Sequence, residues 1–192
     1  AMNLHIRILL NATSSLDVHA IPNAATVASF QQMFSSAQDI HNHAANISYN
    51  HQDTTANITK LRSGAALQPG STIAKNIAQG DDHILHTIFS AVRHFGLLEW
   101  RPDIIDGTPG TLYNVMHEVI ALKTFQTAAI AGGYIRLSPN LTRLNDMTLL
   151  RKFYQSYVFH YLKEQLQKEL KTPGKVAEGA ENREIYRRRT AV

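Results

Sequence analysis

Residues 140–172 read NLTRLNDMTLLRKFYQSYVFHYLKEQLQKELKT and contain neither glycine nor proline. Apolar side chains recur in this stretch every three or four positions, the spacing that places them on one side of an α-helix. They form two stripes, Met147, Leu150, Tyr154, Tyr157 and Tyr161 in the first and Val158, Leu162, Leu166 and Leu170 in the second. Asn145 or Asp146 is suited to cap the start, because a short side-chain oxygen accepts the free backbone N–H groups there. We therefore predict one long helix over these residues.

A second stretch without either helix breaker runs from residue 23 to residue 63. Its apolar residues also step by three and four positions, through Val27, Phe30, Phe34 and Ala37. Asn23 is suited to cap the first turn, so we predict a helix over residues 24–45. Residues 48–55 are poor in helix formers, and either the helix continues to residue 63 or a loop interrupts it there.

Three further segments carry the helical spacing. They are residues 72–78, a stretch from Asp81 and Asp82 to the region of Trp100, and residues 111–130. The last segment is apolar on nearly every side, which is typical of a helix at the centre of a bundle. Residues 4–8 alternate between polar and apolar like a strand, but a strand needs a partner, so their structure stays open.

These patterns predict an all-α protein, an irregular helical bundle of about five helices. We expect a single helical domain over residues 1–172. The dipeptide Pro173-Gly174 then interrupts the helical pattern, and the residues that follow are mostly polar and charged. Residues 173–192 are therefore predicted to be a basic C-terminal tail.

The composition limits the chemistry that the chain can carry. Hydrophobic residues make up 44% of the 192 residues, which is enough for a real core, and cysteine is absent. Without thiols the chain can form no disulfide, no thiolate zinc site and no cysteine nucleophile. We expect no signal peptide, and the sequence has no apolar stretch of membrane-spanning length. We therefore expect an intracellular protein, cytoplasmic or nuclear, that makes no membrane contact.

Positive charge is concentrated near the C-terminus. Residues 1–142 hold 8 Lys and Arg against 9 Asp and Glu, whereas residues 143–192 hold 11 against 6, a balance of +5. Arginine side chains match the geometry of phosphate, and an aromatic ring can stack on a base. The residues predicted to contact a nucleic acid or another acidic partner are Lys171, Lys175, Arg183, Tyr186, Arg187, Arg188 and Arg189. Glutamates interrupt this cluster, so a basic tail that is merely solvated is the alternative.

The first predicted helix has an unusual polar side. It is built from uncharged residues, namely Gln31, Gln32, Ser35, Ser36, Gln38, His41, Asn42 and His43. Such side chains lose less hydration energy than charges when another subunit covers them. We therefore predict that Val27, Phe30, Phe34 and His41 mediate self-association. A general bias of the chain towards Asn, Gln, Ser and His is the alternative explanation.

Candidate catalytic and metal-binding residues are few. His83 and His86 lie three positions apart on a predicted helix, where two imidazoles can share one metal ion. His117 and Glu118 are adjacent, but neighbouring helical residues point about 100° apart and do not face each other. Asp103 and Asp106 lie in a loop and lack the lysine spacing of a nuclease site.

We predict a non-enzymatic interaction or assembly protein, with no cofactor and no metal. It is expected to form a homo-oligomer or to dock a helical protein partner, and to meet an acidic partner with its basic C-terminal segment. Two alternatives stay open. One is a nucleic-acid-binding protein anchored by the arginine-rich tail, and the other is a metal- or histidine-dependent hydrolase.

Overall fold

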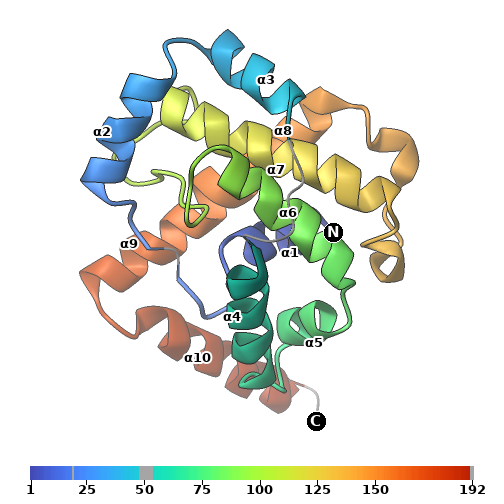
Figure 1. Ribbon diagram of the computed structural model, residues 1–192. Helices are drawn as coiled ribbons and strands as arrows, with labels where there is room; N and C mark the ends of the chain where they lie inside the picture. Colours follow the sequence, from blue (N-terminus) through green and yellow to red (C-terminus); the bar gives the residue numbers. More distant parts are fainter. Residues whose placement is uncertain (19, 48–53, 191–192) are drawn as a thin grey trace.

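The computed structural model describes residues 1–18, 20–47 and 54–190, with the backbone alone for residues 31, 183–185 and 187–190. These residues form helices, turns and loops without any strand, which confirms the all-α prediction (Figure 1). The α-helices are α1 (Met2–Leu9), α2 (Ala24–Met33), α3 (Ala37–Ala45), α4 (Thr55–Ala66), α5 (Thr72–Ala78), α6 (Asp82–His94), α7 (Leu112–Ile130), α8 (Met147–Gln155), α9 (Lys163–Lys171) and α10 (Lys175–Thr190). They are shorter and more numerous than the bundle of about five helices that we predicted.

Helix α7 lies at the centre of the molecule (Figure 1). It contacts α1, α2, α3, α6 and α8, and most of its side chains are buried. A helix with no polar side must be covered all round, because exposed apolar surface is unfavourable in water. The predicted central position is therefore confirmed. The helix ends before Gly132, whose φ of +81° is readily adopted only without a side chain.

The N-terminal segment, whose structure the sequence left undecided, forms helix α1. Residues 4–8 are helical, and α1 packs against α5 and α7 with all five residues from His5 to Leu9 buried. The alternation of polar and apolar residues is misleading here because the helix is covered on most sides. Two of the buried side chains, His5 and Arg7, therefore need hydrogen-bond partners inside the protein.

The predicted helix over residues 24–45 is wrong in one respect, because it is broken in the middle. Helix α2 ends at Met33, and Phe34 has extended backbone with φ −129° and ψ 128°. Ser36 then caps α3, its hydroxyl accepting the backbone N–H of Asp39 at 3.1 Å. Serine side chains compete for backbone hydrogen bonds and so favour a new helix start over continuation. Most of the ambiguous stretch 48–55 lies outside the described residues.

The long C-terminal helix begins at one of the two predicted caps: Asp146 caps α8, and residues 141–143 before it form a 3-10 turn. It then continues to Lys171 through a π-helical segment, Ser156–Leu162. The wider turns of a π-helix rotate the residues that follow around the axis. The buried stripe is consequently assembled from both predicted stripes, as Leu150, Tyr154, Val158, Leu162 and Leu166, while Met147, Tyr161 and Leu170 are exposed.

Two other boundaries differ from the prediction. Helix α6 ends at His94 instead of near Trp100, because Gly96 turns the chain with a φ of +71°. The residues after Gly174 form helix α10, whose second residue, Val176, is buried. The carboxylate of Glu169 accepts the backbone N–H groups of Gly174 at 2.6 Å and Val176 at 3.2 Å, which joins α10 to α9.

Candidate functional site

The residues predicted for self-association divide into two groups. Phe30 and Phe34 are only 4% and 6% exposed, because they pack on each other and on core aromatics. The ring of Phe30 lies edge-on to Tyr113 at 5.4 Å, and the ring of Phe34 is 5.8 Å from Phe95. Both phenylalanines therefore belong to the core of their own chain and present no contact surface. Val27 is half-buried and His41 is exposed.

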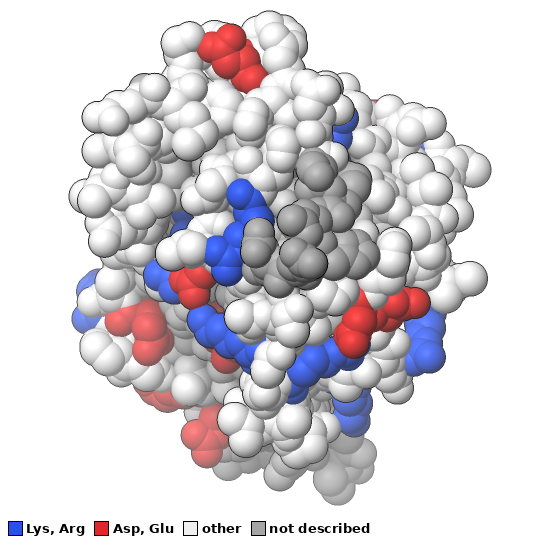
Figure 2. Space-filling view, viewed as in Figure 1, with Lys and Arg blue, Asp and Glu red and all other residues white. Residues whose placement is uncertain are grey.

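The exposed side of α2 and α3, which we call the α2–α3 face, is almost free of charge. Its exposed members with described side chains are Asn23, Ala24, Ala25, Thr26, Ala28, Ser29, Gln32, Met33, Ser35, Ala37, Gln38, His41 and Asn42. Asp39 is its one acidic member, and the hydroxyls of Ser35 and Ser36 lower the pKa of that carboxyl. Figure 2 shows this part of the molecule as white surface with one acidic patch, whereas lysine and arginine gather lower on the same view.

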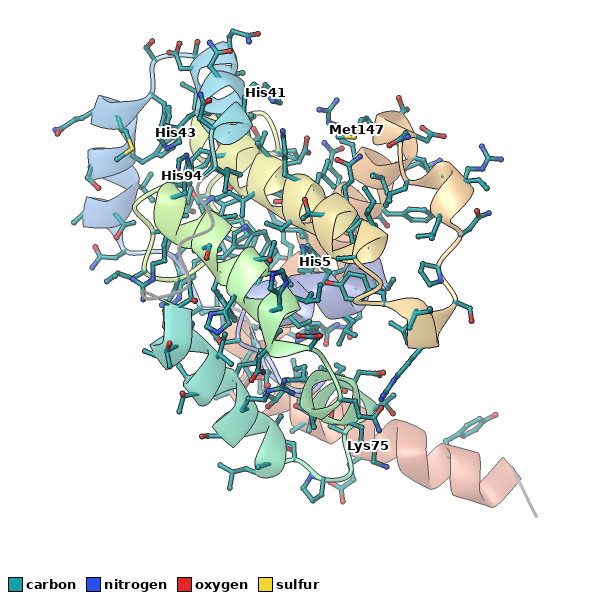
Figure 3. All side chains as sticks on the ribbon, turned by 45° about the vertical axis from the view of Figure 1, so that its right-hand side comes forward. His5, His41, His43, Lys75, His94 and Met147 are labelled. Atoms are coloured by element: carbon teal, nitrogen blue, oxygen red, sulfur yellow. The ribbon has the colours of Figure 1, made fainter. Side chains whose placement is uncertain are left out.

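His43, predicted to belong to the polar side, instead joins α3 to α6. The His43 and His94 rings lie 4.3 Å apart between these helices (Figure 3). Each ring donates its Nε2–H to the backbone carbonyl of the other residue, at 3.1 Å and 3.2 Å. This reciprocal pair fixes the position of α3 on the core, so these imidazoles have a structural role.

The basic C-terminal residues lie on α9 and α10. Lys171 ends α9, and Lys175 begins α10 with an ion pair to Glu178 at 3.0 Å. Tyr186 is exposed. The four predicted arginines, Arg183, Arg187, Arg188 and Arg189, all have helical backbone, and their side chains lie outside the described set.

His117 and Glu118 are buried, but they serve different structural contacts. The Nδ1–H of His117 donates to the Tyr113 carbonyl at 2.8 Å, and its Nε2 accepts the Arg101 backbone N–H at 3.2 Å. The carboxylate of Glu118 accepts from Arg151 Nε at 2.6 Å and from the Gln155 side chain at 3.2 Å. With both of its ring nitrogens bound to backbone groups, His117 is not placed to transfer protons.

The remaining candidates make structural contacts. No group of three or more His, Asp and Glu side chains that could hold a metal ion occurs among the described residues. His86 Nδ1 shares a hydrogen bond with the Thr54 hydroxyl at 2.6 Å. Asp103 accepts the backbone N–H of Asp106 at 3.1 Å and so shapes its own loop, which Asn114 fastens to α7. These contacts bring no catalytic pair together.

A pocket of about 590 Å³, which the sequence did not reveal, lies between α2, α4, α6, α7 and the chain that follows α6. We call it the cationic pocket, because three of its lining side chains are positively charged, Lys60, Arg93 and Arg101, and one, Glu99, is negatively charged. Lys60 binds Glu99 at 2.8 Å, and Arg101 forms a second ion pair with the same carboxylate. The hydrogen bond from Lys60, with the nearby arginines, lowers the pKa of Glu99 and keeps it ionised.

Two neutral residues complete the wall of the cationic pocket. Asn57 is buried, and its side-chain oxygen accepts from the outer guanidinium nitrogen of Arg93 at 2.9 Å. Burial raises the pKa of Tyr113 to about 12, so its hydroxyl stays protonated and donates to the Arg101 carbonyl at 3.1 Å. The turn at Gly96 brings residues 97–101 back across the end of α6 and closes the pocket.

A sequence pattern could not have revealed this pocket. Residues 60, 93, 99 and 101 come from two helices and a loop, and each alone resembles an ordinary surface charge. The nearest signal is the short stretch Glu99-Trp100-Arg101, in which two opposite charges flank the tryptophan. Trp100 is buried and donates its indole N–H to the His117 carbonyl at 3.1 Å, which directs both neighbours towards the surface.

Comparison with known proteins gives no relative for this chain. No family model, no curated protein and no solved structure matches it. Within the described residues, every helix is too short or too polar to cross a lipid bilayer. Function must therefore be argued from the surfaces and pockets of the molecule alone.

Proposed function

We propose that the protein is a non-enzymatic helical assembly protein whose copies associate through the α2–α3 face. The observation that carries this proposal is the nearly complete lack of charge on an exposed two-helix surface. Exposed helices of monomeric proteins usually carry lysine and glutamate, which are costly to desolvate. A surface of amides, hydroxyls and small apolar groups can be covered at lower cost.

A second copy is the partner that fits this surface best. Amide and hydroxyl side chains both donate and accept hydrogen bonds, so the same patch can complement itself across a two-fold axis. Gln32, Gln38 and Asn42 supply such groups, and Met33 supplies an exposed apolar contact. A partner that binds through complementary charge would have a single charged group, Asp39, to bind among the described side chains of this face.

The test is the association state of variants that place charge on the face. Gln32→Lys combined with Gln38→Lys would bring like charges together across the two-fold contact, and we expect the dimer dissociation constant to rise at least about tenfold. Gln167→Lys, at an exposed position of α9, is the matched control and should leave association unchanged. Sedimentation velocity measures both. A wild-type protein that remains monomeric at high micromolar concentration would overturn the proposal.

Nucleic-acid binding by α10 is the second candidate, favoured by the +5 balance of residues 143–192. Arg183 and Arg187 are one helical turn apart on α10, so one side of this helix can follow a phosphate backbone. Affinity for an oligonucleotide should then fall steeply as salt is raised. Arg187→Ala, Arg188→Ala and Arg189→Ala together should remove most of it, and an unchanged affinity would reject this candidate.

A further inference from the structure

The positive groups of the cationic pocket are not balanced by the negative group beside them. Three cations face one carboxylate, and both ion pairs of Glu99 are made with Lys60 and Arg101. No described carboxylate lies within ion-pair distance of Arg93, and its Nε is buried without a hydrogen-bond partner. Like charges that line one pocket repel one another, and an anion in the pocket would relieve that repulsion.

The pocket is built as a binding site and not merely as a charged surface. Its four sides come from α2, α4, α6 and α7 with the loop at residues 96–101. Asn57 and Tyr113, both buried, hold Arg93 and the Arg101 backbone in place. Pro22 and Leu98 add apolar wall beside the cations, and a volume of about 590 Å³ lies within the range of small-molecule sites.

We propose that the cationic pocket binds a small phosphomonoester, with its phosphate group facing Lys60, Arg93 and Arg101. A phosphomonoester carries between one and a half and two negative charges near neutral pH, which matches the excess of two positive charges in the pocket. Guanidinium groups bind phosphate oxygens in a two-pronged geometry, and lysine adds a point charge. The apolar wall accommodates the organic part of the ligand. Asn23, Thr26 and Ser29 belong both to the rim of this pocket and to the α2–α3 face, but the cations that bind the phosphate lie outside that face, so the inference does not require association.

Inorganic phosphate and adenosine monophosphate are suitable probes, titrated at pH 8 and low salt. Amide resonances of residues 96–101 and the side-chain amide of Asn57 should shift saturably in two-dimensional NMR spectra, which locates the binding.

Arg93→Gln should weaken the affinity at least about tenfold, since it removes a charged phosphate contact. Arg101→Gln removes another charged phosphate contact and should likewise weaken the affinity. Because Arg101 lies in a loop, this substitution disturbs the helices less. Lys123→Gln, which removes an exposed charge outside the pocket, is the matched control and should have no effect.

Glu99→Gln provides a test of opposite sign. It removes the one carboxylate of the pocket and should tighten phosphate binding at least about threefold, because the anion no longer meets a like charge. A purely structural cluster of ion pairs would show no saturable binding in any variant. Failure of both probes to bind at about 10 mM, tenfold above a weak dissociation constant, would overturn the proposal. So would affinities that neither Arg93→Gln nor Glu99→Gln changes.

A competition experiment distinguishes a small phosphomonoester from a nucleic acid as the ligand of the cationic pocket. An oligonucleotide without a terminal phosphate carries only singly charged phosphodiesters, so it should not displace adenosine monophosphate from the resonances of residues 96–101. Displacement by this oligonucleotide at comparable nucleotide concentration would assign the pocket to a nucleic-acid backbone and overturn the proposal.

Discussion

At the scale of single residues, the core of this protein contains polar side chains whose hydrogen bonds are satisfied internally. Arg7 is 1% exposed and donates to the Tyr157 hydroxyl at 2.9 Å and to the Asp17 carbonyl at 2.6 Å. His5 of α1 lies in the interior (Figure 3), where its ring is hydrogen-bonded to Thr124 of α7 and to Tyr134. Such groups tolerate burial only while every partner is present, so they fix how the N-terminal segment docks.

His5 should make the stability of the protein depend on pH. The Thr124 hydroxyl donates to the Ile120 carbonyl, so it accepts Nε2–H of His5 at 2.9 Å, and Nδ1 accepts the Tyr134 hydroxyl at 2.5 Å. Burial lowers the pKa of His5 from 6.5 to about 3, and the folded state keeps it neutral. Below pH 6.5 the unfolded chain binds a proton that the folded chain does not, so stability falls as pH falls towards 3.

We therefore expect acidification from pH 7.5 to pH 5 to cost about 2 kcal/mol through this histidine. Urea unfolding of the wild type and of His5→Gln at both pH values isolates the effect, since glutamine cannot gain the proton. His41→Gln, at an exposed position, is the control and should retain the wild-type pH dependence. If the wild type and His5→Gln lose the same free energy between the two pH values, His5 is not the group responsible.

At the scale of elements, glycine and serine decide where the helices end. Ser36 separates α2 from α3, and Gly96 ends α6 early enough for residues 97–101 to close the cationic pocket. Among the described residues outside its chain neighbours, a Cβ at position 96 would meet the Met33 methyl group alone, at 3.7 Å, which is an ordinary contact. The requirement for glycine there is therefore conformational, because φ is +71°.

Gly96→Ala should lower the free energy of unfolding by about 1–2 kcal/mol, the cost of placing a side chain in the left-handed region. Gly110→Ala is a matched control, because Gly110 has no positive φ and a Cβ added there would meet no described atom within 4 Å beyond its chain neighbours. Its effect should stay within about 0.5 kcal/mol. Thermal or urea unfolding measures both, and equal effects of the two substitutions would contradict the conformational explanation.

At the scale of the whole molecule, the helices form a single packed arrangement around α7, with α10 attached at one side (Figure 1). The aromatic and aliphatic side chains of α6, α7 and the α8–α9 helix make one continuous core. Among its described side chains, α10 contributes only Val176 to the buried set. Helices with few buried apolar contacts open more easily than the core does.

Native-state hydrogen exchange should reveal this difference. Amides at the centre of α7, around Ile120, should exchange only through global unfolding and show the full stability of the protein. Amides of α10 beyond Val176 should exchange through local opening, orders of magnitude faster, and their rates should depend little on low urea concentrations. Equal protection of α7 and α10 would show that α10 is held by contacts outside the described side chains.

The sequence by itself determined the helical class, the central position of the helix over residues 111–130 and the cap at Asn23, and it narrowed the cap of the C-terminal helix to Asn145 or Asp146. Hydrophobic spacing and capping chemistry act over a few neighbouring residues, so a sequence contains them. Only the tertiary structure decided three further features. It buried Phe30 and Phe34 in their own core, it made one buried stripe from two through the π-helical segment, and it gathered Lys60, Arg93, Glu99 and Arg101 into the cationic pocket. Each of these depends on contacts between residues far apart in the chain, and local propensities contain no information about such contacts.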